Sequence, residues 1–161
     1  AAIERRDGPT SLLLSRQNLP FVKRNDAQVG LIARGGYVLA EAQGGAPRVA
    51  LLATGSEVAL ALDAQKALAE QGIAARVVSM PCTSVFDRQD AAYRESVLPR
   101  GLLRVAIEAG VSDFWRKYVG LEGGVVGIDR FGESAPAGEL FKYFGFTVPR
   151  VVETVKQVLH G

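Results

Sequence analysis

Continuous apolar runs alternate with stretches of helical periodicity along most of this 161-residue chain. Apolar runs without polar interruption are typical of parallel strands that are covered on both faces. Such runs predict core strands at residues 48–54, 75–80, 103–108 and 124–128. Glycine pairs bracket a further apolar segment, residues 37–40, and favour an edge strand there over a helix.

Helical spacing of apolar residues fills most of the intervals between these runs. One helix is predicted between Ser56, a good N-cap residue, and Gly72, with Glu57 suited to the positive helix start. Its apolar face consists of Val58, Ala61, Leu62 and Leu68. Further helical patterns cover residues 85–97 in part, 113–118, and 134–145 with Pro136 in the first turn. A last helix begins after Thr147, and its apolar face consists of Val151, Val152, Val155, Val158 and Leu159.

The order of these elements predicts the fold class. A strand, a helix and a strand within residues 48–80 form the pattern of a right-handed βαβ crossover. Because the alternation continues to the end of the chain, we expect an α/β fold. The predicted architecture is a three-layer αβα sandwich with a mostly parallel, mixed five-stranded sheet.

The beginning of the chain carries its most distinctive local pattern. Residues 12–14 form an apolar run that predicts a buried strand, and the polar triplet of residues 15–17 ends it. Arg16 would then project at the carboxyl edge of a sheet, where open α/β sheets bind ligands. A guanidinium there suits a phosphate, although the commoner role of such an arginine is a weak surface ion pair. Residues 20–26 are predicted to be a linker, and the change in composition places a domain boundary between about residues 20 and 33.

Composition and charge restrict the class of protein. With 48% hydrophobic residues, the chain is long enough to bury the core of one domain. Lys and Arg total 19 against 17 Asp and Glu, so the net charge of +2, spread along the chain, argues against nucleic-acid binding. No apolar stretch approaches the ~20 residues of a membrane span, and no secretory signal is recognised at the start. The single cysteine, Cys82, allows no intrachain disulfide and fits a cytoplasmic location.

The chain offers little that resembles an active site. No group of Cys or His has metal-ligand spacing. Cys82 is interpreted as a small packing residue, because a catalytic thiol needs an activating base and the only histidine, His160, stands one residue from the end. Glu108 follows a core strand, but without a paired acid or base it is expected to be a structural hydrogen-bond acceptor.

Two helix starts and one aromatic group leave alternatives open. The turn at residues 54–57 offers backbone N–H groups to an anion, yet Glu57 would repel it, and capping by Ser56 is the commoner role. Capping is likewise the interpretation of Ser134. The aromatic group is either core or an interface, and both remain open; it consists of Phe114, Trp115 and Tyr118.

Eight short motifs follow one another along the chain. They lie at residues 7–10 (Asp-Gly-Pro-Thr), 14–19 (Leu-Ser-Arg-Gln-Asn-Leu), 33–39 (Ala-Arg-Gly-Gly-Tyr-Val-Leu), 53–58 (Ala-Thr-Gly-Ser-Glu-Val), 77–81 (Val-Val-Ser-Met-Pro), 89–99, 108–110 (Glu-Ala-Gly) and 131–136 (Phe-Gly-Glu-Ser-Ala-Pro). In this order they resemble the carboxyl-terminal part of transketolase. The resemblance begins at about residue 8 and continues to the end of the chain.

The resemblance implies a division of the chain and a function for the intact enzyme. Residues 1–33 would be the tail of a preceding pyrimidine-binding domain plus a linker, and residues 34–161 the transketolase C-terminal domain. The family's homodimer uses thiamine diphosphate and Mg²⁺ or another divalent metal to transfer a two-carbon ketol group from a ketose phosphate to an aldose phosphate. Arg16 matches the family's arginine that contacts the substrate phosphate. The family's diphosphate-and-metal motif, its catalytic histidines and its activating glutamate have no match here, so we expect no catalytic, cofactor-binding or metal-binding residue in this piece.

Two other roles remain as alternatives at this stage. The open sheet edge, with helix starts at residues 54–56 and at Ser134, would also suit a module that binds a regulatory anion or nucleotide. A purely structural role in dimerisation, through the aromatic residues 114, 115 and 118, is the other alternative.

Overall fold

The computed structural model describes residues 3–161, and its central feature is one five-stranded sheet. The strands are β1 (Tyr37–Ala40), β2 (Val49–Ala53), β3 (Ala75–Ser79), β4 (Leu103–Ile107) and β5 (Gly124–Val126). They lie in the order β1-β3-β2-β4-β5. Strands β3, β2, β4 and β5 are parallel to their neighbours, whereas β1 pairs antiparallel with β3. The mostly parallel, mixed five-stranded sheet is therefore confirmed.

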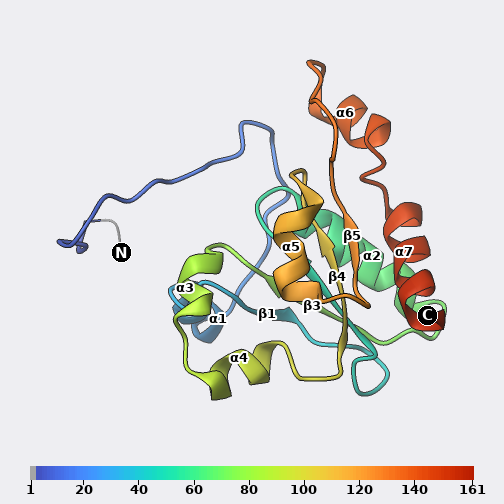
Figure 1. Cartoon of the computed structure of the whole chain (residues 1–161), viewed down its shortest axis with the longest axis horizontal. Coiled ribbons are helices and arrows are strands. Elements are labelled where there is room, and N and C mark those ends of the chain that lie inside the picture. The colour runs from blue at the N-terminus through green and yellow to red at the C-terminus, as the bar shows by residue number, and fades with distance from the viewer. Residues whose placement is uncertain (1–2) are drawn as a thin grey trace.

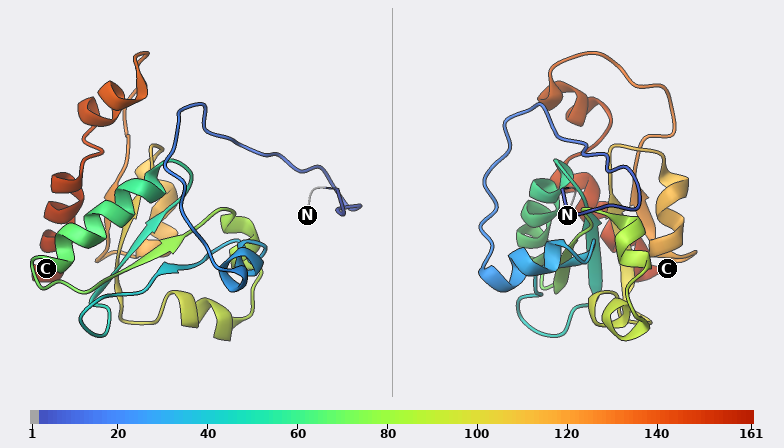
Figure 2. Two further views of the ribbon diagram at one scale, coloured as in Figure 1. Left: turned by 180° about the vertical axis from the view of Figure 1, so that it is seen from behind. Right: turned by 90° about the vertical axis from the view of Figure 1, so that its left-hand side faces the viewer.

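Helices cover both faces of this sheet (Figures 1 and 2). They are α1 (Asp26–Ile32), α2 (Glu57–Ala69), α3 (Thr83–Asp87), α4 (Ala91–Val97), α5 (Ser112–Val119), α6 (Ala137–Tyr143) and α7 (Val148–His160). Helices α2 and α7 pack on one face, and α3, α4 and α5 pack on the other. Helix α6 stands beyond the sheet, at the top of Figure 1. The three-layer αβα arrangement is confirmed.

Apolar burial explains why these sequences form these layers. Strand β2 is buried along its whole length, which accounts for its uninterrupted apolar sequence. Its alternate side chains supply two separate cores, one beneath α2 and α7 and one beneath α3, α4 and α5. Val151 and Val155 of α7 belong to the first core, and Trp115 of α5 belongs to the second. The polar side of each helix is left to solvent, as the helical spacing predicts.

The chain reverses its direction of winding at β2. From β2 it crosses to β3 on one side, and from β3 it crosses back over β2 to β4 on the other side. Ala53, the last residue of β2, lies in register with Ser79 of β3 and Ile107 of β4. In open α/β sheets, such a switch point at the carboxyl ends of the strands is where ligands bind.

Both edges of the sheet end in short strands, and side chains bond carbonyl groups within these strands or immediately before them. Strand β1 has four residues and an irregular register against β3. The Gln28 side chain of α1 donates to the carbonyl of Leu39 at 2.8 Å, and the Tyr93 hydroxyl donates to the carbonyl of Gly36 at 2.8 Å. Strand β5 has three residues, and Arg116 donates to the carbonyl of the preceding Gly123 at 2.9 Å.

Some predicted local structure is wrong. Residues 12–14 form no strand, and Leu13 is 91% exposed. The reason is that no described strand pairs with this run, so nothing covers its apolar side chains. Helix α1 was not predicted; it begins at the end of the predicted linker of residues 20–26, after a reciprocal cap in which Asn25 and Gln28 exchange side-chain and backbone hydrogen bonds. Residues 1–2 of the predicted tail lie outside the described residues.

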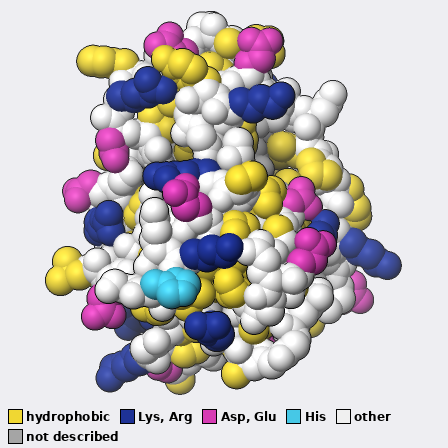
Figure 3. All heavy atoms as spheres, turned by 90° about the vertical axis from the view of Figure 1, so that its right-hand side faces the viewer, with side chains coloured by type: hydrophobic (Ala, Val, Ile, Leu, Met, Phe, Trp, Pro, Cys, Tyr) yellow, Lys and Arg dark blue, Asp and Glu magenta, His cyan; other side chains and the backbone are white. Residues whose placement is uncertain are grey.

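The surface carries charges of both signs. On the face shown in Figure 3, Lys and Arg side chains are interspersed with Asp and Glu, and no large region of one sign appears. Such a surface gives no electrostatic footprint for nucleic acid on this face. Among residues 3–161, no helix combines the length and the apolarity that crossing a bilayer requires.

Candidate functional site

The carboxyl edge of the sheet, at the switch point between β2 and β4, contains a hollow of about 890 Å³. We call it the edge hollow; residues 11–15, 54–57, 80–83, 108–111, 114 and 115 line it. Its walls therefore come from the turns after β2, β3 and β4, from the start of α5, and from the segment that precedes the domain. The only charged side chains in this lining are those of Glu57 and Glu108.

Glu57 is the first residue of α2 and is only 4% exposed. The Ser56 hydroxyl donates to its carboxylate at 3.0 Å, and the backbone N–H of Ala109 also faces that carboxylate. Burial raises the pKa of the Glu57 carboxyl, and these donors oppose the rise. Ser56 occupies the N-cap position but makes no side-chain cap bond, so its predicted capping role is wrong: its hydroxyl serves the glutamate instead.

Glu108 follows directly after β4 and lies within the same hollow. Burial, and secondarily the negative charge of Glu57, raises the pKa of the Glu108 carboxyl to about 7. One carboxylate oxygen, Oε2, is buried and has no hydrogen-bond partner among the described residues. The sequence-based interpretation of Glu108 as an acceptor without a paired acid is therefore wrong, because the structure brings a second acid beside it.

The segment that precedes α1 crosses this edge of the sheet. Residues 11–15 line the edge hollow, and residues 19–22 line a neighbouring hollow of about 530 Å³ on the other side of the turn at Gly55. Gly55 has a φ of +54°, which suits glycine at this sharp strand-to-helix turn. Arg24 fastens the segment to the sheet: its Nε donates to the buried Tyr37 hydroxyl at 2.6 Å, and its other nitrogen donates to the carbonyl of Val22.

Arg16 lies on this crossing segment, immediately after the residues that line the edge hollow. Its side chain is exposed and makes no hydrogen bond or ion pair with any residue in the described range 3–161. A guanidinium with all of its donors unused is suited to bind an external anion.

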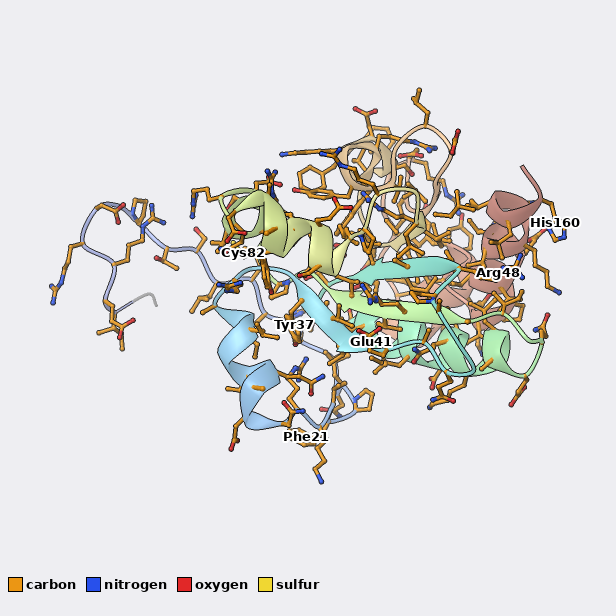
Figure 4. The ribbon with its side chains drawn as sticks, turned by 90° about the horizontal axis from the view of Figure 1, so that it is seen from below. Phe21, Tyr37, Glu41, Arg48, Cys82 and His160 are labelled. Carbon is orange, nitrogen blue, oxygen red and sulfur yellow. The ribbon has the colours of Figure 1, made fainter. Side chains whose placement is uncertain are left out.

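Cys82 is exposed, so its interpretation as a packing residue is wrong. A contact of 3.5 Å with the Ser84 hydroxyl is the largest cause of the lowered pKa of its thiol. His160 lies at the opposite end of the domain from Cys82 (Figure 4), and its ring contacts the carbonyl of Lys156. The distance between these regions leaves the thiol without a histidine base.

The structure also places the remaining residues that the sequence analysis singled out, namely the aromatic group and Ser134. Trp115 and Tyr118 are buried in the second core, which decides their role, whereas Phe114 is 55% exposed and lines the edge hollow. Ser134 is exposed and caps no helix, because α6 begins at Ala137 with a proline in the N-cap position. Within residues 3–161, no group of three or more His, Cys, Asp or Glu side chains is arranged to hold a metal ion.

The site thus combines an acidic hollow with an adjacent free arginine. The buried carboxylate of Glu57 and the half-buried one of Glu108 disfavour an anionic ligand in the edge hollow itself, since no cation in its lining offsets them. Arg16 lies outside the lining of that hollow. The carboxylate pair is the feature that sequence reasoning missed; only the order of the strands places Glu57 and Glu108 together.

Comparison with known proteins gives consistent matches. The family model described as "Transketolase-like TK C-terminal domain" matches residues 35–147. Transketolase 1 of Escherichia coli strain K12 is 58% identical over 158 residues, which are 98% of this chain and 24% of that protein. This chain therefore spans about a quarter of the length of that relative.

Solved structures give the same picture. A Pichia stipitis transketolase in complex with sedoheptulose 7-phosphate is 41% identical, with a TM-score of 0.78, over 89% of this chain and 20% of that chain. A protein described as a split-gene transketolase, an inactive beta4 tetramer, is 28% identical, with a TM-score of 0.65, over 90% of this chain and 48% of that chain.

Proposed function

The chain belongs to the transketolase family, and we propose that it forms the C-terminal domain of a ketol-transferring enzyme. In this proposal residues 34–161 are the C-terminal domain, and residues 1–33 are the tail of a preceding pyrimidine-binding domain plus a linker. The intact homodimer would transfer a two-carbon ketol group from a ketose phosphate to an aldose phosphate. The match of the family model to residues 35–147 is the observation that carries the proposal.

Thiamine diphosphate and a divalent metal would supply the carbanion chemistry in the intact enzyme, as they do in the family. The edge hollow does not fit that cofactor, because it presents two carboxylates where a diphosphate would need cations. We therefore place the cofactor in other parts of the intact enzyme and assign this chain no catalytic residue. A cytoplasmic location stays a prediction.

Arg16 is the one substrate-binding residue that we propose for this chain. It matches the family's phosphate-contacting arginine in the Leu-Ser-Arg-Gln motif at residues 14–17, and its donors are free. A forked guanidinium binds phosphate oxygens through paired, charge-assisted hydrogen bonds. Its role would be to orient the sugar phosphate, while the chemistry takes place at the opposite end of the substrate.

A chimera tests the proposed function directly. This chain would replace the matching 158 residues of Escherichia coli transketolase 1, a relative of sufficient identity for the domains to fit together. We expect the chimera to form ribose 5-phosphate and xylulose 5-phosphate from sedoheptulose 7-phosphate and glyceraldehyde 3-phosphate. A chimera that folds and dimerises but transfers no ketol group would contradict the proposal.

The role of Arg16 is tested in the same chimera. The Arg16→Ala variant is expected to lower kcat/KM for phosphorylated acceptors by about 10- to 100-fold, or roughly 1.5–3 kcal/mol, mainly through KM. Activity with an unphosphorylated acceptor should change little. Arg48→Ala removes an exposed arginine at the opposite edge of the domain and serves as the control (Figure 4). An equal loss with both kinds of acceptor would show that Arg16 does not bind phosphate.

A further inference from the structure

The two glutamates of the edge hollow are brought together by the register of the sheet. The last residues of β2 and β4, Ala53 and Ile107, lie opposite each other, so the residues that follow them emerge at the same place. Glu108 is the residue after β4, and Glu57 opens the helix after β2. The carboxylate of Glu57 faces the backbone N–H of Ala109, the immediate neighbour of Glu108.

No basic side chain lines the hollow around this pair. The crossing segment contributes residues 11–15, which are uncharged, and the start of α5 contributes two aromatic residues. The turn after β3 contributes Cys82, the only other titratable group of the lining. The buried carboxylate of Glu57 and the half-buried one of Glu108 repel each other when both are charged, and neither has a basic partner in the lining to offset its desolvation.

We propose that Glu57 and Glu108 hold one proton between them below neutral pH and that release of this proton, as the pH rises through neutrality, destabilises the carboxyl edge of the sheet. Glu57 keeps the negative charge, because the Ser56 hydroxyl and the Ala109 N–H both donate to it. Glu108 carries the proton, and its buried Oε2, which has no partner within residues 3–161, is where an unpaired charge would otherwise lie.

The direction of the pH effect follows from this arrangement. Burial and the charge of Glu57 raise the pKa of Glu108 to about 7, above its ordinary value of 4.5. The folded chain therefore holds a proton that the unfolded chain has already released between these two values. The contribution of this proton to stability is fully present below pH 4.5, is lost as the pH rises from there through about 7, and is absent above that, with the folding constant decreasing by at most about tenfold per pH unit.

The test combines a titration with an unfolding experiment on the 161-residue chain. Carboxyl ¹³C NMR of the glutamate side chains, from about pH 4 to pH 9, is expected to show one carboxyl that titrates near neutrality. Urea unfolding over the same range is expected to show the loss of stability with rising pH. In Glu108→Gln the amide replaces the protonated acid, so the denaturation midpoint should exceed that of the wild-type chain at about pH 8 and lose this pH dependence.

A matched control uses the same chemistry at the other end of α2. Glu70→Gln changes an exposed glutamate beyond the last turn of that helix and should leave the pH dependence intact. The proposal is overturned if every glutamate carboxyl titrates near its ordinary value, or if the Glu108→Gln and wild-type midpoints run parallel with pH. Should Glu108→Gln fail to fold, the titration of the wild-type chain decides alone. The pairing is independent of the proposed ketol transfer, so either can fail without the other.

Discussion

Gln65 is a buried polar side chain that fixes α2 to the sheet, and its removal should destabilise the domain. It is 5% exposed and lies on the inner side of α2. Its Nε2 donates to the carbonyl of Ala75 at the start of β3, at 2.8 Å, and to the carbonyl of Glu41 just beyond β1, at 2.9 Å. A single amide thus joins the helix that begins with Glu57 to two strands.

The expected magnitude follows from these two bonds. Gln65→Leu keeps a side chain of similar size but leaves both carbonyls without this donor. Each lost donor costs about 1–3 kcal/mol when the acceptor is buried, and the acceptor beyond β1 is only partly buried. The apolar side chain recovers part of this through its own burial. We expect the free energy of unfolding to fall by about 1–3 kcal/mol. For a domain of this size, each kcal/mol lowers Tm by roughly 2–4 °C.

The measurement is urea and thermal unfolding of the variant beside a matched control. Gln71→Leu removes the amide of another glutamine, whose Nε2 donates to the carbonyl of Ala67 at 3.0 Å on the exposed end of the same helix. That change should cost less than about 0.5 kcal/mol. Equal destabilisation by the two substitutions would refute the reasoning, because it would mean that burial of the Gln65 amide contributes nothing.

Two further predictions concern Gly36, which immediately precedes β1, and Cys82, which lies in the turn after β3. Gly36→Ala is expected to lower the free energy of unfolding, measured in urea, by about 1–3 kcal/mol, because an added Cβ would lie 2.7 Å from the sulfur of the buried Met80. Gly132→Ala is the control and should be nearly neutral, because its added Cβ meets nothing within 4 Å. Similar urea midpoints for the two variants would contradict this prediction. Ser84→Ala should slow the reaction of Cys82 with a disulfide reagent near neutral pH, because the serine hydroxyl lowers the pKa of the thiol. If the reaction rate is unchanged both near neutral pH and at high pH, the hydroxyl does not lower the thiol pKa.

The sequence predicts the layers of this fold well for a physical reason. A strand covered on both faces has to be apolar throughout, and β2 is buried along its entire length. The helical spacing of Val151 and Val155 likewise predicts the buried face of α7. The local spacing of apolar residues is enough to predict such elements, because the pattern in each one is set by which of its own residues are buried.

Other features were not predicted, either because the local sequence carries no signal for them or because its signal was overlooked. The apolar run at residues 12–14 predicts burial, yet no described strand covers it. Asn25 and Gln28, three residues apart, have the pattern of a reciprocal helix cap, a local signal by which α1 could have been predicted. The pairing of Glu57 with Glu108 has no local signal at all, since it depends on β4 lying beside β2 on the side away from β3.

The short edge strands of the sheet have a consequence for how copies of this domain can associate. A long, straight outer strand offers unpaired backbone groups on which another chain can extend the sheet, and this is a common route to aggregation. Here β1 is short and irregular, Gln28 bonds one of its carbonyls, Tyr93 bonds the carbonyl of Gly36 just before it, and β5 spans only three residues. Any self-association of this domain should therefore proceed through side-chain surfaces and not by growth of a shared β-sheet.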